Sequence, residues 1–450
     1  MASTPASPLL TAPILPTLLR LALPNMGAML AGSVAAIAET AYVGRLGVPA
    51  LAGMAVIFPI IMLQGMLSAG AIGSGVSAAI ARALGAGDRA KADALAVHAF
   101  WIAVGAGAIS SLLMETFGPA LLAALGGKGA ALAEAIAFAR VAFLGSISVW
   151  LLNVLAAVLR GAGNMKLPSL VLLGTAITQV LVGGALGLGL GPFPQLGMPG
   201  VAAGQLVAAS VGALLLFAGL VRGQAGVTLG LATTPLARAR FADILRVGAP
   251  ACLSPLQTIA TVLILTRLVA EFGPDALAGY GIGTRLEFLM VPIAFAVGVA
   301  SVPMVGTALG GQAVARARRV AWTAGAVAAL LLGSVGLVLA VGPDLWTRLF
   351  THAPAVRDAA TLYFRWVGPT YALYGVGLCL YFASLGAGQV RGVLLAGTLR
   401  LVVVALGGLV LVRTAAPEFA VFALIAIGMI AYGAATAWAV WRADWSTPSR

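Results

Sequence analysis

Long apolar runs separated by short polar segments set the pattern of the chain. An α-helix rises ~1.5 Å per residue, so about 20 apolar residues cross the ~30 Å hydrocarbon core of a bilayer. The run from Leu167 to Val221 holds no charged residue and is too long for one helix, so Gly191–Gly200 is the predicted turn inside it. The whole pattern predicts twelve membrane-spanning helices, at residues 20–44, 53–81, 95–118, 132–159, 167–191, 198–221, 245–270, 277–310, 320–342, 358–385, 392–413 and 419–441.

The composition excludes a soluble domain. Of 450 residues, 61% are hydrophobic and 9% are charged, which indicates an all-α polytopic membrane protein, because a helix satisfies its own backbone polar groups in lipid. The formal net charge is +13, but the basic residues lie mostly in short loops and form no patch interleaved with aromatic residues. We therefore expect no nucleic-acid partner. Cys252 and Cys379 have apolar neighbours and show neither metal-ligand nor disulfide spacing.

The positions of lysine and arginine predict the orientation. With the N-terminus inside, most basic residues fall in inner loops and tails, such as Arg316, Arg318 and Arg319. This asymmetry predicts a protein integral to the plasma (bacterial inner) membrane with both termini in the cytoplasm. The first twenty residues lack a basic n-region and are broken by prolines, so we expect a short tail rather than a signal peptide.

Three short matches indicate an internal duplication. They are LGVPALAG at Leu46 with FGPDALAG at Phe272 (272 − 46 = 226), ALGAG at Ala83 with ALGGQ at Ala308 (308 − 83 = 225), and GAG at Gly161 with GAG at Gly386 (386 − 161 = 225). An even number of helices per copy predicts two six-helix lobes in the same orientation, related by a pseudo-twofold axis along the membrane normal, as in transporters. We place the lobes at 1–221 and 245–450, joined by a cytoplasmic loop at 222–244.

The first predicted helix carries an acid at membrane depth. Glu39 lies in the apolar run Leu21–Gly44, where an ionisable residue costs at least ~2.5 kcal/mol and usually faces a bundle interior or a water-filled cavity. Small residues share its helical face and allow close approach of a neighbouring helix: Ala28, Gly32 and Ala35. The alternative is a glutamate that snorkels to the interface. The matching position in the second copy, 39 + 226 = 265, is Leu265, so the acid is not a shared scaffold residue.

Three more residues of this helix are candidates for a polar cluster around Glu39. Pro24 lacks a backbone N–H and is expected to kink the helix. Asn25 precedes Glu39 by fourteen residues, which at ~100° per residue brings it to within roughly 40° of the same face. Tyr42 lies one turn beyond the acid.

Motifs along the chain resemble those of the multidrug and toxic compound extrusion (MATE) transporters. In chain order they are LALP and ETAYVGRLG in the first helix, ARALGAGDRAKA after the second, LRGAGNMKLPSL after the fourth and ALAGYGIGTRLE opening the eighth. The resemblance implies export of organic cations and drugs against a proton or sodium gradient. It also implies that Glu39, which stands where the family's D-T-x-x-x-G pattern has its Asp, carries the coupling ion.

The branch that the chain resembles most is the DNA-damage-inducible-F-like one. In that branch the fifth helix supplies an Asn and an Asp, and the sixth a Thr, to the same polar cluster. Here Thr178 or Gln179 stands near the Asn position and Val182 near the Asp position. Gln205 matches the Thr. The second carboxylate of that branch is therefore missing.

Four polar residues are candidates in the second lobe. Gln257 and Arg365 stand on helices where a sodium-binding branch has acids, so we do not expect such a sodium site. Arg285 and Glu287 open the eighth helix, where a structural charge pairing with other helices and a substrate-binding role both fit. Arg365 and three nearby tyrosines also fit a cavity wall, although interfacial anchoring is the favoured role for the tyrosines: Tyr363, Tyr371 and Tyr374.

The motifs do not indicate an enzyme. GAGD at Gly85–Asp88 imitates an intramembrane aspartyl protease, but no second aspartate lies well inside a predicted span. A nucleotide-binding G-x-x-x-x-G-K-[ST] is absent from the sequence. His98 and His352 lack a metal or catalytic partner at helical spacing, so we expect packing roles, no metal site and no cofactor.

We therefore predict a secondary active multidrug exporter that works by alternating access, as proton-coupled antiport of organic cations or amphipathic drugs. The proton, bound at Glu39, is the expected coupling ion. The alternatives are a sodium-coupled drug antiporter and a lipid-linked oligosaccharide flippase of the same superfamily. A flippase needs cationic side chains for pyrophosphate, whereas the best-placed group in the first lobe is acidic. The expected partners are small amphipathic or cationic substrates and the lipid bilayer, and the expected state is a monomer.

Overall fold

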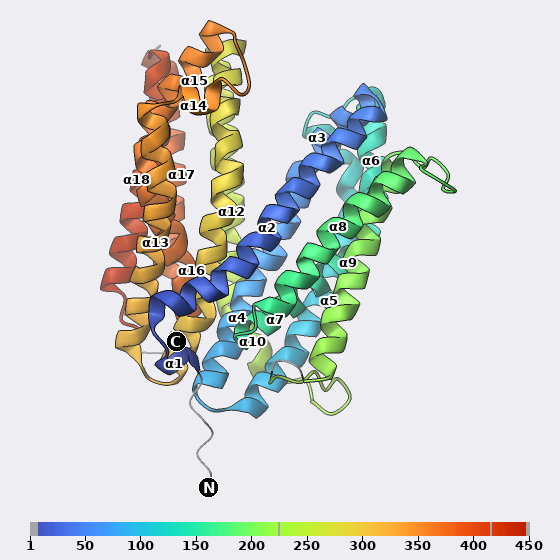
Figure 1. Cartoon of the computed structure of the whole chain (residues 1–450), viewed down its shortest axis with the longest axis vertical. Helices are drawn as coiled ribbons and strands as arrows, with labels where there is room; N and C mark the ends of the chain where they lie inside the picture. The colour runs from blue at the N-terminus through green and yellow to red at the C-terminus, as the bar shows by residue number, and fades with distance from the viewer. Residues whose placement is uncertain (1–7, 224–225, 415, 447–450) are drawn as a thin grey trace. The chain divides into compact units, whose positions relative to one another are not determined.

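The computed structural model of the protein describes residues 8–223, 226–414 and 416–446, and within those ranges its regular structure is entirely helical (Figure 1). Eleven helices are long and apolar enough to cross a membrane. A twelfth span consists of α6 (Gly129–Leu144) and α7 (Ser146–Gly161), which are bent by 54° at the break between them. The prediction of an all-α polytopic membrane protein with twelve spans is confirmed for this part of the chain.

The other helices follow in chain order. In the first half they are α1 (Pro8–Thr11), α2 (Ile14–Arg45), α3 (Val48–Gly65), the π-helix η1 (Met66–Ile72), α4 (Gly73–Gly85), α5 (Arg89–Ala124), α8 (Lys166–Leu188) and α9 (Met198–Val221). In the second half they are α10 (Arg238–Ala251), α11 (Leu253–Ala270), α12 (Pro274–Gly310), α13 (Val314–Val341), α14 (Asp344–Thr347), α15 (Pro354–Val367), the 3₁₀ turn η2 (Gly368–Thr370), α16 (Tyr371–Ala387), α17 (Arg391–Thr414) and α18 (Glu418–Arg442).

The described residues form two compact units. One comprises residues 23–248, and the other comprises residues 249–446 together with residues 8–22. Two features differ from the predicted lobes. Residues 8–22 group with the second unit, where the Arg316 guanidinium donates hydrogen bonds to the carbonyls of Leu9 and Ala12. In addition, α10 begins at Arg238, inside the segment 222–244 that was predicted to be a loop.

Several predicted single spans are interrupted. Between α3 and α4 the chain adopts the π-helix η1, where Asn153 of α7 donates a hydrogen bond of 2.9 Å to the Ser68 hydroxyl. The span of α6 and α7 breaks at Gly145, where a Cβ atom would overlap the Leu206 side chain. The span of α15 and α16 is interrupted at Gly368–Thr370, which contains Pro369 and therefore lacks one backbone donor. These breaks depend on local packing as well as on sequence.

The first unit contains a close helix pair, α8 and α9. A Cβ atom at Gly204 of α9 would overlap the backbone of Gly183 of α8, and it would lie 3.1 Å from the Gln179 carbonyl oxygen. A Cβ atom at Gly200 would lie 2.5 Å from the Leu186 carbonyl oxygen. Small residues at a membrane helix contact let the backbones approach closely. This contact sets the position of α8, and Gln179 and Gly183 lie on that helix.

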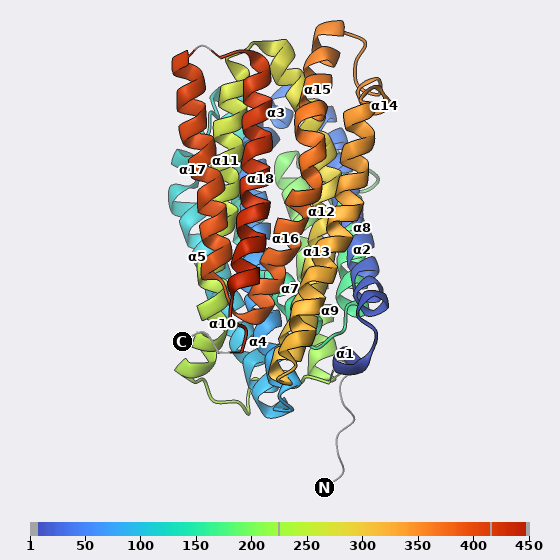
Figure 2. The ribbon, with the colours of Figure 1, turned by 90° about the vertical axis from the view of Figure 1, so that its left-hand side faces the viewer.

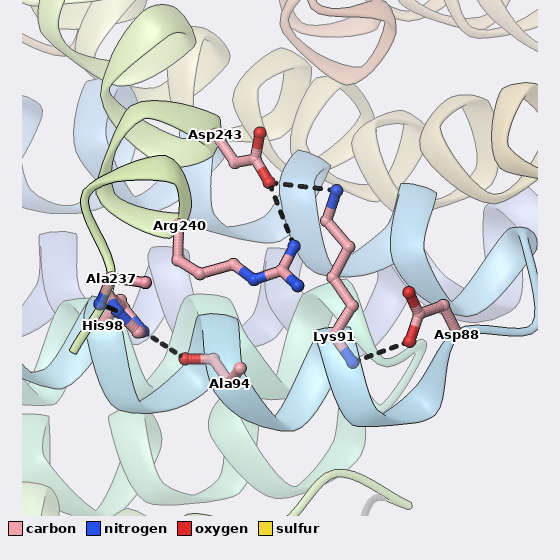
Figure 3. Close-up of polar contacts among 7 residues, drawn as sticks. All are labelled: Asp88, Lys91, Ala94, His98, Ala237, Arg240 and Asp243. Atoms are coloured by element: carbon pink, nitrogen blue, oxygen red, sulfur yellow. Dashed lines mark hydrogen bonds and ion pairs between the residues drawn. The ribbon is translucent and has the colours of Figure 1, made fainter. Parts of the chain in front are cut away.

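The segment that leads into α10 is bound to α5 (Figure 3). The buried His98 ring bonds through Nδ1 to the Ala94 carbonyl oxygen at 2.6 Å, and its Nε2 accepts a hydrogen bond from the Ala237 N–H at 2.8 Å. The Asp243 carboxylate pairs with Lys91 at 3.0 Å and with Arg240 at 3.7 Å. His98 thus bonds within α5 through Nδ1 and joins α5 to the segment before α10 through Nε2.

In the second unit, α12 packs against α11, α13, α15 and α16, and α17 packs against α18. Figure 2 shows α17 and α18 running side by side. Fully buried aromatic side chains fill the space between these helices: Tyr363, Phe364, Phe382 and Phe422. One member of this aromatic core, Tyr363, bonds to Glu287 of α12.

Gly204→Ala tests the contact between α8 and α9. The added methyl group would overlap the Gly183 backbone, so we expect a loss of about 1–3 kcal/mol in stability and a lower midpoint of thermal unfolding in detergent. Gly174→Ala is the matched control, because Gly174 lies on α8 with nothing within 4 Å of the added carbon. Equal midpoints for the two variants would contradict the observed contact.

Candidate functional site

Glu39 lies on α2 in the first unit, and its side chain is buried, with 9% of its surface exposed. The Gln179 side chain of α8 donates a hydrogen bond from Nε2 to Glu39 Oε2 at 2.9 Å. The other carboxyl oxygen, Oε1, is buried and has no hydrogen-bond partner within the described part of the chain. The acid therefore faces a neighbouring helix and does not snorkel outward.

One face of α2 brings the acid to this position. Asn25, Ala28, Ala35, Glu39 and Tyr42 recur at helical spacing and are all buried. The predicted stripe of small residues is wrong at Gly32, which is exposed and where an added Cβ atom would have nothing within 4 Å. α2 also continues through Pro24 without ending there. The close approach predicted for this face therefore does not extend over Gly32.

Tyr42 lies against α8 one turn beyond Glu39. A Cβ atom at Gly183 would lie 2.9 Å from the Tyr42 hydroxyl oxygen, and one at Gly184 would lie 3.6 Å from its ring. The hydroxyl is buried and has no hydrogen-bond partner among the described residues. It also interacts electrostatically with Glu39. Gly183 thus leaves the space that the Tyr42 hydroxyl occupies.

The remaining predicted members of this cluster are not joined to Glu39 by hydrogen bonds. Thr178 and Gln205 are half-buried, and neither side chain makes a hydrogen bond in the part of the chain that the structure describes. Asn25 is buried, and its Nδ2 has no partner among the described residues. Of the two alternatives on α8, Gln179 rather than Thr178 contacts the acid.

Glu287 has a denser set of polar neighbours in the second unit. Tyr363 of α15 donates a hydrogen bond to Glu287 Oε1, and the Tyr371 hydroxyl of α16 lies 3.3 Å from the same oxygen. Tyr363 and Tyr371 are 0% and 2% exposed, so the interfacial role predicted for these two tyrosines is wrong. Both instead bind the carboxyl group of α12.

The other second-lobe candidates lie apart from this cluster. The Arg285 guanidinium lies 5.2 Å from the centre of the Phe350 ring, and Arg365 is exposed. Gln257 of α11 donates a hydrogen bond of 2.7 Å to the Thr398 hydroxyl of α17. Its Oε1 is buried without a partner among the described residues. Arg285 and Glu287 therefore have different partners.

The sequence patterns did not single out Arg400. It lies within α17, inside the predicted span 392–413, and its guanidinium carbon is 5.3 Å from the Tyr374 ring centre and 6.0 Å from that of Tyr432. Its Nε atom is buried and has no hydrogen-bond partner in the described residues. The sequence feature that could have identified Arg400 is a lone arginine inside an apolar span, since such residues are rare and usually functional.

The sequence model of the MatE family matches residues 24–183 and 250–410, one range in each unit, and together these ranges cover more than half of the chain. The chain belongs to the MatE family. The two matches begin 250 − 24 = 226 residues apart, which equals the offset of the predicted internal repeat.

Curated relatives agree with membership of the MatE family, and a solved structure shares the fold. A probable multidrug resistance protein NorM from Thermotoga maritima is 28% identical over 363 residues, covering 78% of this chain and 75% of its own. One from Deinococcus radiodurans is 33% identical over 371 residues, covering 76% and 73%. An outward-facing multidrug resistance MATE transporter of the MOP superfamily aligns with a TM-score of 0.88 at 24% identity, covering 98% of both chains.

These findings confirm that the chain is an integral membrane protein of the MATE transporter family with the two-lobe fold. Membership of the DNA-damage-inducible-F-like branch stays a prediction.

Gly183→Ala tests how α8 accommodates Tyr42 in this MatE protein. The new methyl carbon would lie 2.9 Å from the Tyr42 hydroxyl, so we expect reduced thermal stability and reduced export, with Gly184→Ala as the milder neighbouring control. Adding Tyr42→Phe removes the clashing oxygen. A double-mutant cycle should then show a favourable coupling of about 0.5–3 kcal/mol. Strictly additive effects would mean that the two residues do not meet.

Proposed function

We propose that this protein is a secondary active multidrug exporter that moves cationic or amphipathic small molecules out of the cell in exchange for protons. The observation that carries the proposal is the buried Glu39, which has one hydrogen-bond donor, Gln179, and one unpartnered oxygen in the described part of the chain. The NorM relatives, named as probable multidrug resistance proteins, support the substrate class. The protein acts as a monomer in the plasma membrane with both termini in the cytoplasm.

The arrangement at Glu39 suits a group that gains and loses a proton. An ionised carboxylate accepts hydrogen bonds through about four lone-pair sites, but here a single amide is bonded to it. A neutral carboxyl group needs fewer hydrogen-bond partners than an ionised one. Uptake of a proton therefore removes a charge that the site compensates poorly, and release of the proton restores the charge that attracts a cationic substrate.

The energy available is sufficient for export. A proton that moves inward down a membrane potential releases ~2.3 kcal/mol per 100 mV, and ~1.4 kcal/mol corresponds to a tenfold concentration ratio. One proton per substrate therefore supports roughly tenfold or greater accumulation outside. The internal repeat predicts two six-helix lobes, an architecture that transporters use for alternating access.

Two observations favour a proton over sodium. Val182 stands near the position where the resembled branch has a second acid, so Glu39 has no carboxylate neighbour on α8. Within the described residues, no group of three or more His, Cys, Asp or Glu side chains is arranged to hold a metal ion. A flippase for pyrophosphate-linked glycans is disfavoured because Arg400, which lies beside the Tyr374 and Tyr432 rings in the second unit, already interacts electrostatically with Glu287.

The coupling ion can be tested in everted vesicles. Uptake of an exported drug should follow an imposed pH gradient and should not change when sodium replaces potassium, because the site offers one carboxyl group and no further acidic ligand. Drug-resistance assays in an exporter-deficient host, compared with complementation of a glycan-precursor flippase, separate the exporter from the flippase. Sodium-driven uptake at zero pH gradient would contradict the proposal that the proton is the coupling ion.

Glu39 itself can be tested by two substitutions. Glu39→Gln keeps the size and hydrogen-bonding capacity of the side chain but cannot titrate, so proton-driven export should be lost while folding and substrate binding largely survive. Glu39→Asp restores the family's usual acid with one methylene less of reach, so it should keep part of the activity. Drug uptake into vesicles, driven by a pH gradient, measures both.

Glu115→Gln is the control for these variants, because Glu115 is an exposed acid on α5 of the same unit. All variants must first unfold at similar temperatures in detergent, since the loss of a buried charge can also change stability. Full proton-driven export by Glu39→Gln would place the coupling group elsewhere.

A further inference from the structure

The second unit holds an acid whose surroundings differ from those of Glu39. Glu287 of α12 is half-buried and accepts a hydrogen bond from Tyr363. The Tyr371 hydroxyl is within 3.3 Å of the same carboxyl oxygen and within 3.2 Å of the Tyr363 hydroxyl, so it can donate to either. Two hydroxyl groups from two helices thus converge on one carboxyl oxygen.

Arg400 supplies the opposite charge. Its guanidinium attracts the Glu287 carboxylate and lies over the rings of Tyr374 and Tyr432. The ring contacts stabilise a cation in apolar surroundings but do not neutralise it. Nε of Arg400 is buried without a hydrogen-bond partner among the described residues. The compensation of Arg400 therefore depends on the charge of Glu287.

The titratable groups around Glu287 come from every helix of this cluster. Those that interact with Glu287 are Tyr280 on its own helix α12, Tyr363 on α15, Tyr371 and Tyr374 on α16 and Arg400 on α17, while Tyr432 on α18 lies beside Arg400. Glu287 is the carboxyl group among these neighbours, and carboxyl groups at membrane depth serve as proton relays in pumps and transporters.

We propose that Glu287 is a second proton-binding residue of the transport cycle, paired with Arg400 so that its protonation leaves an uncompensated cation in the second unit. The inference rests on the proposed proton-coupled export and extends it to the other lobe. With Glu287 ionised, the pair is neutral overall and the two tyrosine hydroxyls stabilise the carboxylate. With a proton from the outer side added to a Glu287 oxygen, Arg400 alone determines the local charge.

This change in the charge of Glu287 affects the binding of a cationic substrate. A neutral Glu287–Arg400 pair tolerates a nearby organic cation, whereas an uncompensated guanidinium repels it. Uptake of the proton therefore favours departure of the cation, and release of the proton on the inner side prepares the lobe for the next one. A purely structural ion pair would keep Glu287 ionised throughout and would release no proton.

Proton release on substrate binding separates these roles. Tetraphenylphosphonium, a permanent cation that carries no titratable proton, is added to purified protein in weakly buffered detergent. A pH dye in the solution records the protons that are released. We expect Glu287→Gln and Glu39→Gln each to release roughly half as many protons per bound cation as the unmodified protein, and the double variant to release none. Glu287→Asp should recover most of the release. Glu271→Gln, an exposed acid of the same unit, should match the unmodified protein.

A second measurement does not depend on the probe or on full activity. Infrared difference spectra of reconstituted protein between acidic and alkaline buffer should contain a protonated-carboxyl carbonyl band that Glu287→Gln removes and that Tyr363→Phe shifts. Gln can still accept both tyrosine hydrogen bonds, so this variant is expected to fold. Unmodified proton release by Glu287→Gln, or a carbonyl spectrum that it leaves unchanged, would overturn the proposal. If no pH gradient drives export, the proposed function is wrong. The infrared evidence for protonation of Glu287 would be unaffected by that result.

Discussion

Polar atoms at membrane depth have no water to bind, so each depends on a partner inside the protein. The two acids meet this requirement to different degrees. Glu39 has one amide donor and one unpartnered oxygen among the described residues, whereas Glu287 has two tyrosine hydroxyls and the charge of Arg400. The same requirement accounts for the bonds that tie α3 to α7, where Gln64 donates to the Ser146 hydroxyl at 2.8 Å.

Hydropathy predicted the number and order of the spans because lipid imposes one length and one composition on every crossing helix. It did not predict where the helices break. The bend at Gly145 and the π-helix at Met66–Ile72 arise from contacts with other helices, such as the Leu206 side chain beside Gly145. The start of α10 at Arg238 was also missed, since its first turns are polar and were assigned to the loop before it.

The same distinction applies to the site residues. Glu39 was predictable because a carboxylate inside an apolar run is conspicuous, but its partner was not, since Thr178 and Gln179 are neighbours in sequence and helix rotation decides between them. Arg400 was missed because one arginine hardly changes the mean hydropathy of its span. Tyr363 was assigned to the interface on composition alone, whereas its hydroxyl is bound by an acid 76 residues away in the chain.

The helix that carries Glu39 also belongs to both units, because its residues before Leu23 group with the second unit and the rest with the first. Pro24 stands at that passage and lacks the N–H that would close a hydrogen bond to the preceding turn. Hydrogen bonds between successive turns stiffen a helix, so the bond missing at Pro24 makes α2 easier to bend where it changes units. Bending at Pro24 is therefore separated from Glu39 by fifteen residues along the same helix.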